Sequence, residues 1–432
     1  MTDRLLRGRV LSFRREPQAP DDLAALDWFE DGAVLIRGGM IAATGDFAVV
    51  TAAAPGVPVT DHRPHLITAG FIDAHIHFPQ GQIVASWGAQ LMDWLNTYTF
   101  PAETRFADPA HAERMAGAFF DLLLRNGTTT ASAFCSVHPA SVDAFFAEAA
   151  RRNLRMLGGK VLMDRNAPEA LLDTPQTAYD DSVTLIHRWH GKGRALYAIS
   201  PRFAITSTPA QMAAAEALIA ARPDCHVQTH LSENHAEIAA ACALYPQADG
   251  YLDIYARYGM LGPRMLLGHA IHLSDRDRVV IAETGSHPVH CPTSNLFLGS
   301  GLFDAAALRT AGATSGIATD IGAGMSWSML RTAGAAYAVA QLQGQRLDPL
   351  RAFWWITRGN AEVLGLADKI GTLEPGTEAD IVVLDSRATP DLALRMEAAQ
   401  DLKDELFALL ILGDDRAVVE TYAAGQPVKP RA

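Results

Sequence analysis

Five polar side chains that can do metal chemistry stand at the ends of apolar runs in this chain of 432 residues. His75 and His77 end the first run, and residues two apart on a strand project to the same face, so both imidazoles can reach one ion. His230, His269 and Asp320 end three later runs. Neutral imidazole and carboxylate are the usual ligands of catalytic zinc. Each residue alone could be incidental or a turn former, but together they predict a metal site of His75, His77, His230 and Asp320.

Glu233 follows His230 by three positions and is the predicted proton carrier. Zinc lowers the pKa of bound water to about 7, and hydrolysis also needs a group that moves protons. If a short helix begins after the strand, Glu233 lies about one turn from His230 and can point into the same cavity. The alternative is that Ser232 caps this helix and Glu233 only favours its positive N-terminus. Beside a metal, we favour general acid–base catalysis by Glu233.

Strand-like runs that alternate with Ala- and Leu-rich helical stretches must position these side chains. Such alternation is typical of a parallel sheet with crossover helices, and eight units over roughly 300 residues predict a (β/α)8 barrel with its site at the C-terminal strand ends. The runs are His65–His77, Thr128–Phe134, Arg155–Met163, Ala195–Pro201, His226–His230, Arg264–His269, Pro288–Cys291 and Gly316–Asp320. The helical stretches include Ala110–Arg125, Val142–Arg152, Pro209–Arg222 and Ala236–Leu244.

Both ends of the chain show short strands instead of this alternation. Gly38-Gly39 predicts a hairpin, and the acidic stretch Pro17–Asp31 predicts a loop. The fold class is therefore α/β: a TIM barrel over residues 66–367, and a small β-sandwich domain formed by residues 1–65 and 368–432. The expected terminal strands are Leu5–Phe13, Ala33–Arg37, Met40–Gly45, Ala379–Leu384 and Ala417–Tyr422.

Composition limits the partners. The net charge is -12 at pH 7 with histidine neutral, and an acidic surface repels phosphate backbones, so we expect no nucleic-acid partner. No uncharged run resembles a membrane span, and the start of the chain has no apolar signal-peptide core, so we expect no membrane. The chain has four cysteines, none spaced as Cys-x-x-Cys, which is typical of reduced thiols in a cytoplasmic protein.

Two stretches resemble the amidohydrolase superfamily. Gly70–His77 is similar to its first-strand signature, and Gly371–Leu384 to its return to a small β domain. The resemblance implies the same four metal ligands and makes His269 a further active-site histidine. Two-metal members carry a carboxylated lysine at the end of the fourth strand, but that strand here ends in Pro201-Arg202, and Lys160 lies on the third strand. We therefore expect one Zn²⁺ per chain, although Fe²⁺ suits the same ligands.

Five stretches resemble the guanine deaminases of this superfamily, and Leu91–Glu103 is the most specific of them. The resemblance implies hydrolysis of guanine, a purine, to xanthine and ammonia by a homodimer. Asp320 would accept the proton of the water, Glu233 would protonate a ring nitrogen, and His269 would steady the nucleophile or the developing oxyanion. The other four stretches are His75–Gln80, Ser200–Phe203, Thr229–Asn234 and Cys291–Gly299.

Side chains in these stretches are predicted to contact the purine. Gln80 has both a donor and an acceptor for the purine edge, and Arg202 could donate to the carbonyl oxygen. Phe203 and Trp94 could cover the planar ring. The ordinary alternatives are a turn residue for Gln80, a surface ion pair for Arg202, and core packing for the aromatic rings. The full predicted set of substrate contacts is Gln80, Trp94, Leu95, Arg202, Phe203, His230 and Glu233.

Two other functions fit parts of the pattern. One is a related deaminase or dechlorinase that acts on a triazine, a pterin or another purine; the other is a non-catalytic barrel that serves as a scaffold. A second deaminase class uses His-x-Glu followed by Pro-Cys-x-x-Cys. His235-Ala236-Glu237 and His111-Ala112-Glu113 match the first half, but the second half does not occur. We therefore interpret both matches as exposed helix residues.

Overall fold

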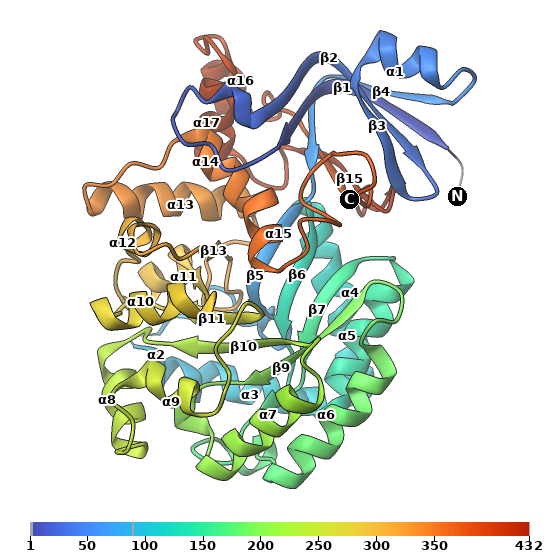
Figure 1. Ribbon diagram of the computed structural model, residues 1–432. Coiled ribbons are helices and arrows are strands. Elements are labelled where there is room, and N and C mark those ends of the chain that lie inside the picture. The colour runs from blue at the N-terminus through green and yellow to red at the C-terminus, as the bar shows by residue number, and fades with distance from the viewer. Residues whose placement is uncertain (1–2, 89, 432) are drawn as a thin grey trace.

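Eight parallel strands form the centre of the computed structural model, which describes residues 3–88 and 90–431 (Figure 1). Two backbone hydrogen bonds close the barrel between its first strand and the segment that follows its last strand: Asp320 N donates to His75 O at 3.0 Å, and His77 N donates to Ile321 O at 2.8 Å. The predicted (β/α)8 barrel is therefore confirmed. Its strands are β5 (Phe71–His77), β6 (Thr128–Phe134), β7 (Arg155–Gly159), β9 (Ala195–Pro201), β10 (His226–Leu231), β11 (Met265–His269), β12 (His287–His290) and β13 (Gly316–Ile317), with the short β8 (Val161–Leu162) paired to β9.

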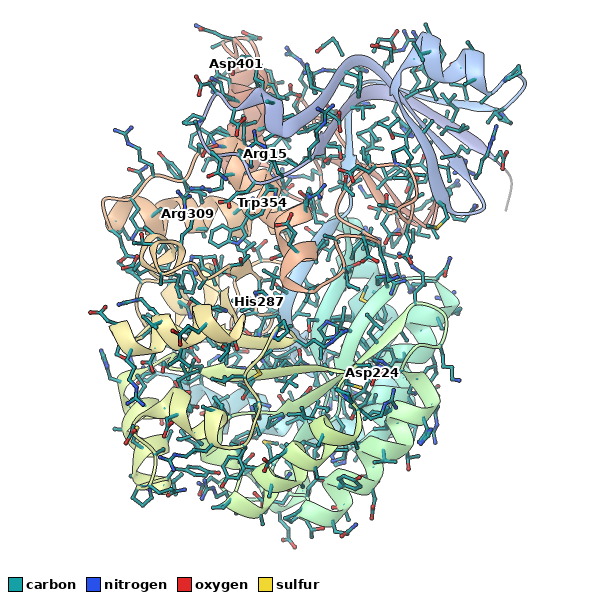
Figure 2. The ribbon with its side chains drawn as sticks, in the orientation of Figure 1. Arg15, Asp224, His287, Arg309, Trp354 and Asp401 are labelled. Atoms are coloured by element: carbon teal, nitrogen blue, oxygen red, sulfur yellow. The ribbon has the colours of Figure 1, made fainter. Side chains whose placement is uncertain are left out.

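Helices cover the outside of the barrel, and their sequences explain why they form. In α4, Asp108 caps the N-terminus by accepting a hydrogen bond from Ala110 N, and buried side chains such as Met115, Phe119 and Leu123 recur every three or four residues. The packed side chains fill the space between ribbons (Figure 2). The helices from the barrel onward are α2 (Leu91–Trp94), α3 (Phe100–Thr104), α4 (Pro109–Arg125), α5 (Pro139–Arg151), α6 (Pro175–Trp189), α7 (Pro209–Ala221), α8 (His235–Leu244), α9 (Tyr251–Arg257), α10 (Asp275–Thr284), α11 (Pro292–Phe297), α12 (Ala305–Thr310), α13 (Met329–Leu342), α14 (Pro349–Trp354) and α15 (Asn360–Val363).

The two ends of the chain meet in one mixed sheet of seven strands, which confirms the predicted terminal β domain (Figure 1). The strand order is β16-β15-β14-β4-β1-β2-β3, so β4 lies between an N-terminal strand and a C-terminal strand. The elements of this domain are β1 (Arg4–Phe13), β2 (Leu26–Arg37), β3 (Met40–Asp46), β4 (Val59–Ala69), β14 (Ile381–Leu384), β15 (Val418–Ala423) and β16 (Gln426–Pro427), with the helices α1 (Phe47–Ala53), α16 (Pro390–Met396) and α17 (Leu402–Leu412). The division of the chain at residues 65 and 367 stays a prediction.

The loop predicted at Pro17–Asp31 is wrong over its second half, because β2 begins at Leu26 and pairs with β1. The acidic residues that suggested a loop are partners of arginines on the neighbouring strand. Arg7 binds Asp31 at 2.7 Å, and Arg9 binds Glu30 at 3.1 Å. Opposite charges across an antiparallel pair stabilise it, so polar character here accompanies a strand.

Two predicted strands are each divided in the structure. The run His65–His77 splits at Gly70 into the end of β4 and the whole of β5, which belong to different sheets. A Cβ at Gly70 would lie 2.3 Å from Thr129 Oγ1, so only glycine fits where the chain passes between the sheets. The run Arg155–Met163 splits into β7 and β8. The predicted hairpin at Gly38-Gly39 is confirmed, with both glycines at positive φ between β2 and β3.

One structural observation bears on the prediction that the protein has no membrane partner. Among the described residues, every helix is too short or too polar to cross a lipid bilayer.

Candidate active site

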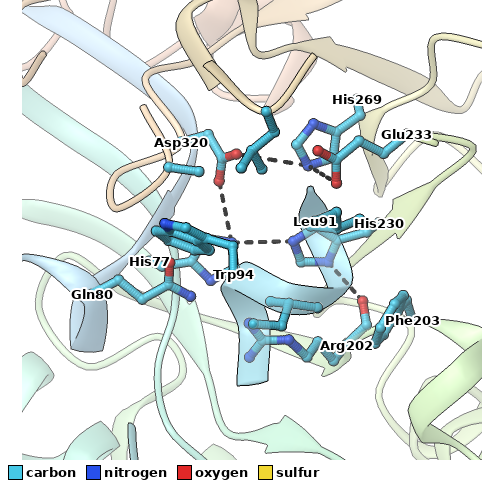
Figure 3. A pocket seen from close by; sticks show the side chains of 13 residues that line it. His77, Gln80, Leu91, Trp94, Arg202, Phe203, His230, Glu233, His269 and Asp320 are labelled. Carbon is cyan, nitrogen blue, oxygen red and sulfur yellow. Dashed lines mark hydrogen bonds and ion pairs between the residues drawn. The ribbon is translucent and has the colours of Figure 1, made fainter. Parts of the chain in front are cut away.

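A pocket lies at the C-terminal ends of the barrel strands, where the sequence placed the candidate residues (Figure 3). Every predicted site residue except His75 lines it, and His75 lies directly behind Asp320. The structure therefore brings together in one cavity side chains that are as much as 240 positions apart in the sequence. The lining residues are His77, Gln80, Leu91, Trp94, Leu95, Arg202, Phe203, His230, Glu233, His269, Leu298, Asp320 and Ala323.

Four atoms of metal-ligand type converge at the floor of this pocket. The Oδ1 atom of Asp320 lies 3.3 Å from His75 Nε2 and 3.3 Å from His77 Nε2. His77 Nε2 in turn lies 3.1 Å from His230 Nε2. The ligand atoms of His75, His77 and His230 all lie within 4.8 Å of one another. Three imidazoles and one carboxylate this close fit a single divalent cation.

The hydrogen bonds and burial keep these groups in the forms that bind metals. His230 Nδ1 lies 2.7 Å from the carbonyl oxygen of Arg202, which can only accept, so Nδ1 carries the proton and Nε2 is free for a metal. Burial and the neighbouring imidazoles hold the pKa of His230 well below its usual value. Burial alone would raise the pKa of Asp320, but hydrogen bonds from His75 and His77 outweigh it and hold that pKa well below its usual value.

Two other candidate ligands near the cluster fit a metal less well. Burial raises the pKa of Cys291 well above its usual value, so its thiol stays protonated. The Nδ2 atom of Asn295 donates to His269 Nδ1 at 2.8 Å, which leaves the proton of His269 on Nε2. That Nε2 lies 3.4 Å from Glu233 Oε2 and 3.7 Å from Asp320 Oδ2. His269 therefore presents its Nε2–H to the cavity, where it can donate a hydrogen bond to an anionic group.

Glu233 enters the pocket beside His269 and is buried (Figure 3). Burial and the charges of Glu237 and Asp320 raise the pKa of Glu233 well above its usual value, so the carboxyl can carry a proton near neutral pH. Ser300 Oγ donates to Glu233 Oε1 at 2.9 Å and holds the side chain in place. A buried carboxyl with a raised pKa in a cleft is suited to proton transfer.

The helix after β10 differs from the sequence prediction. It begins at His235, and Asn234 rather than Ser232 caps it, with Asn234 Oδ1 accepting from Ala236 N at 2.8 Å. The interpretation of Glu237 as an exposed helix residue is wrong. Its buried Oε2 accepts from Glu233 N at 2.7 Å, and this bond anchors the backbone that carries the candidate acid. His111 is buried as well, because it packs edge-on against Phe106.

Three residues at the ends of site strands adopt left-handed backbone conformations. The φ angles are +49° at Ser232, +67° at His269 and +52° at Asp320. Side chains other than glycine adopt such φ angles rarely, and each costs on the order of 1–3 kcal/mol. The chain thus turns sharply as it leaves β10, β11 and β13. For β13 the strand itself ends at Ile317, earlier than predicted, and Asp320 lies beyond it.

Arg202 and Gln80 lie across the pocket from Glu233 (Figure 3). Both contact a buried carboxylate, that of Glu103. Arg202 Nη1 donates to both carboxylate oxygens of Glu103, at 2.8 and 2.9 Å. Gln80 Nε2 donates to Glu103 Oε1 at 2.9 Å, and Gln80 Oε1 accepts from Gly322 N at 3.3 Å. The ring of Trp94 is buried, and its Nε1 donates to Ser86 O. Arg202, Gln80 and Trp94 are thus each held in place by hydrogen bonds within the protein.

Comparison with known proteins identifies the family of this chain. The model of the amidohydrolase family matches residues 66–428. The chain belongs to the amidohydrolase family. A model described as an imidazolonepropionase-like composite domain matches residues 32–56.

The curated relatives of this amidohydrolase include guanine deaminases. That of Escherichia coli is 47% identical over 432 residues, which cover 100% of this chain and 98% of the relative. A probable guanine deaminase of Deinococcus radiodurans is 38% identical, with 99% of each chain covered. The solved structure of the Escherichia coli enzyme matches this amidohydrolase with a TM-score of 0.96 at 46% identity and 100% coverage of both chains. A guanine deaminase from C. acetobutylicum with guanine bound in its active site matches with a TM-score of 0.88 at 27% identity, over 99% of this chain and 100% of that one.

Some side chains that shape the site of this amidohydrolase were not predicted. Glu103 closes the Leu91–Glu103 stretch but had no assigned role, and its partners lie far away in the sequence. Asn295 and Ser300 hold His269 and Glu233. Asn295 lies in the Cys291–Gly299 stretch but had no assigned role, and Ser300 lies just outside that stretch. Asp73, two residues before His75, accepts from Thr319 N at 3.1 Å and so braces the residue before Asp320. Its place in the first-strand signature was the one available signal.

Lys160 has no part in the pocket. It follows β7, and its buried ammonium pairs with Asp173. The end of β9 carries Arg202 and no lysine. In the described part of the chain, no lysine lines the pocket, which agrees with a site for a single ion.

Proposed function

We propose that this protein hydrolyses guanine to xanthine and ammonia, with one zinc ion per chain. The observation that carries the proposal is the pocket itself. It joins a cluster of four ligand-type groups, a buried carboxyl with a raised pKa, and an arginine–glutamine wall suited to a purine edge. The full-length similarity to guanine deaminases supports the choice of substrate.

The predicted metal site comprises His75, His77, His230 and Asp320. Zinc bound there would supply a Lewis acid and lower the pKa of a water molecule to about 7. The donor set fits zinc because imidazole nitrogens and carboxylate oxygens are its usual ligands in proteins. Fe²⁺ suits the same donors, so elemental analysis of the purified protein decides between the two metals.

Glu233 and Asp320 divide the proton transfers. Water adds to the ring carbon that bears the amino group, Asp320 accepts a proton from that water, and Glu233 gives a proton to the adjacent ring nitrogen. Asp320 then gives its proton to the amino group, which leaves as ammonia, and Glu233 takes back the proton of the added hydroxyl as the carbonyl of xanthine forms. The raised pKa of Glu233 keeps it protonated before this step. The Nε2–H of His269 stabilises the negative charge that develops on the attacking oxygen.

We assign the purine contacts to the wall of the pocket that lies opposite Glu233. Arg202 donates to the carbonyl oxygen of guanine, and Gln80 reads the neighbouring edge of the ring. Phe203, Trp94 and Leu95 cover the ring faces and exclude water. His230 and Glu233 complete the set from the metal side. Glu103 acts as a positioning residue, because it fixes both Arg202 and Gln80.

The other functions are less well supported. Solved triazine hydrolases match this chain at 21% and 22% identity, which is evidence for a shared fold alone. A non-catalytic scaffold has no reason to keep four ligand-type groups and Glu233 around one cavity.

The decisive experiment is incubation of the purified protein with guanine. We expect stoichiometric release of ammonia and the change in ultraviolet absorbance that accompanies conversion to xanthine. Parallel reactions contain adenine, a pterin and an aminotriazine as controls. If guanine is left intact while another amino-heterocycle is consumed, the proposed substrate is wrong. If every compound is left intact by the zinc-loaded protein, the proposed chemistry is wrong.

The homodimer and the cytoplasmic location belong to the same proposal. The family resemblance supports a pair of identical chains, and light scattering coupled to gel filtration measures the mass directly. A mass of one chain at micromolar concentration would contradict the dimer. Cell fractionation with an antibody to the protein tests the location.

A further inference from the structure

A second cavity of about 480 Å³ lies between the helices α12, α13 and α14, the end of β12 and the loop that precedes β13. Figure 2 labels Arg309 and Trp354, which both line it. Among the described residues, none lines both this cavity and the active-site pocket. The cavity is therefore a separate site from the active-site pocket.

Aromatic rings form much of the wall of this cavity. His290 stacks on Phe303 with 4.6 Å between ring centroids and 11° between ring planes, and Trp355 lies 5.9 Å from His290. Trp354 lines the cavity beside Trp355. Flat aromatic surfaces favour a flat partner, because offset stacking adds to the burial of apolar area.

The charged groups on the wall are mostly cationic. Arg309, Arg346 and Arg351 line the cavity, with Glu16 as the acidic residue among them. Arg351 Nη2 already binds Glu16 at 2.8 Å, and Arg309 Nη1 lies 3.8 Å from the same oxygen. Arg346 makes no ion pair within residues 3–88 and 90–431. The wall thus has more positive than negative charge, which attracts an anion.

Two buried nitrogen atoms on the wall have no partner in the described protein. They are Trp354 Nε1, in a side chain that is 5% exposed, and His290 Nδ1, in a side chain that is 2% exposed. Buried donors are nearly always hydrogen-bonded, and Trp355 Nε1 meets this rule by donating to Ser315 O at 2.7 Å. An indole N–H can only donate, so a ligand here must supply an acceptor.

We propose that this cavity binds a small planar aromatic acid, in which a ring of pyrimidine or purine size carries a carboxylate or a phosphate. The ring packs against Trp354, Trp355 and the stacked His290–Phe303 pair. The acidic group accepts hydrogen bonds from Arg309 and Arg346, and an acceptor of the ligand satisfies Trp354 Nε1. The volume is sufficient for one such molecule.

Calorimetric titration of the zinc-loaded protein tests the proposal. Excess xanthine fills the active-site pocket, and the probes are orotate, guanosine 5′-monophosphate, guanosine and inorganic phosphate. We expect orotate, guanosine 5′-monophosphate or both to bind, while guanosine and inorganic phosphate each bind at least about tenfold more weakly. Which of the two acids binds more tightly identifies the preferred anionic group.

Charge-reversal variants locate the binding. The double variant Arg309→Glu with Arg346→Glu should weaken binding by at least about tenfold, because both residues are exposed and their replacement spares the core. Trp354→Phe removes the indole N–H and should weaken binding less. The matched control is Arg276→Glu, an exposed arginine on α10 far from the cavity lining, which should leave binding unchanged.

Several results would overturn the proposal. These are the absence of binding by both acids, equal binding by inorganic phosphate alone, displacement of the bound acid by xanthine, and full binding by the double variant. A change of oligomeric state in the double variant, measured by light scattering, would instead make this face an interface between two copies of the chain.

Discussion

The two halves of the active-site pocket hold their side chains by different means. On the metal side, the side chains come from strands and strand ends, and several separate backbone and side-chain groups orient them. The carbonyl of Arg202 orients His230, and hydrogen bonds from Thr319 to Asp73 brace the segment before Asp320. On the purine side, Gln80 and Arg202 depend on one side chain, Glu103 of α3.

This difference separates the chemistry from the choice of substrate. The barrel strands carry the groups on the metal side. Any reaction that the fold performs would therefore use the same geometry on this side. The purine side is tied to a short helix after β5, which can change without altering the barrel. Mutations on the two sides should therefore have different kinetic signatures.

The largest effect is expected on the metal side. Asp320→Ala removes the carboxylate that three neighbouring imidazoles face, so we expect loss of the bound metal and a fall of activity to the uncatalysed background. Elemental analysis and ammonia release measure both. Asp275→Ala, at a fully exposed position of α10, is the matched control and should keep metal and activity. Two metals per chain in the unmodified protein would contradict the single-ion site.

Glu233→Gln should keep the metal and lose about 10²–10⁴-fold in kcat, because proton transfer by a positioned group contributes that much. Steady-state kinetics on guanine, with elemental analysis of the same sample, gives the result. The control is Glu283→Gln on the exposed face of α10, where no change is expected. Activity near that of the unmodified protein would show that Glu233 is not the proton carrier.

Glu103→Gln tests the purine side. We expect KM for guanine to rise about 30-fold or more with a smaller change in kcat, since a buried charge pair that loses one partner costs on the order of 2–5 kcal/mol. The ratio of kcat/KM for guanine over 2-aminopurine, which lacks the carbonyl oxygen, should fall as well. A loss of kcat alone, with that ratio unchanged, would place Glu103 outside substrate recognition. Thermal unfolding of the same variant shows whether the fold is kept.

Ser300→Ala should have the smallest effect. It removes one hydrogen bond to Glu233 and should lower kcat by about two- to tenfold, the range of a single hydrogen bond. Because that bond lowers the pKa of Glu233, its loss raises this pKa further. The limb of the pH–kcat profile that reports Glu233 should therefore move to higher pH. A limb that stays in place would mean that another group controls it.

Much of the fold and of the metal side could be predicted from the sequence. Barrel strands are buried on both faces, so they read as continuous apolar runs, and several predicted limits agree with the structure to within a residue. The polar residues that interrupt those runs at their ends mark the site. The helices between the strands were predicted from the Ala- and Leu-rich stretches that alternate with these runs.

The side chains that hold the site residues in place could not be predicted, because they act through contacts between segments that are distant in the sequence. Glu103 and Glu237 each lie in a helical pattern, where a glutamate is usually solvated, and only the tertiary structure shows that both are buried with specific partners. The acidic residues of β2 suggested a solvated loop, but they belong to a strand. Their arginine partners lie on or next to the neighbouring strand and could not be recognised from the sequence.

The position of β4 in the terminal sheet has a consequence for how the protein is made. One edge of β4 pairs with β1, but the other edge pairs with β14, near the end of the chain. During synthesis on the ribosome the whole barrel emerges before Ile381 does, so this edge stays open until translation is almost complete. An open strand edge is a template for unwanted pairing with other chains. A nascent chain that stalls after the barrel would therefore expose an aggregation-prone edge, and the last 50 or so residues act as its cover.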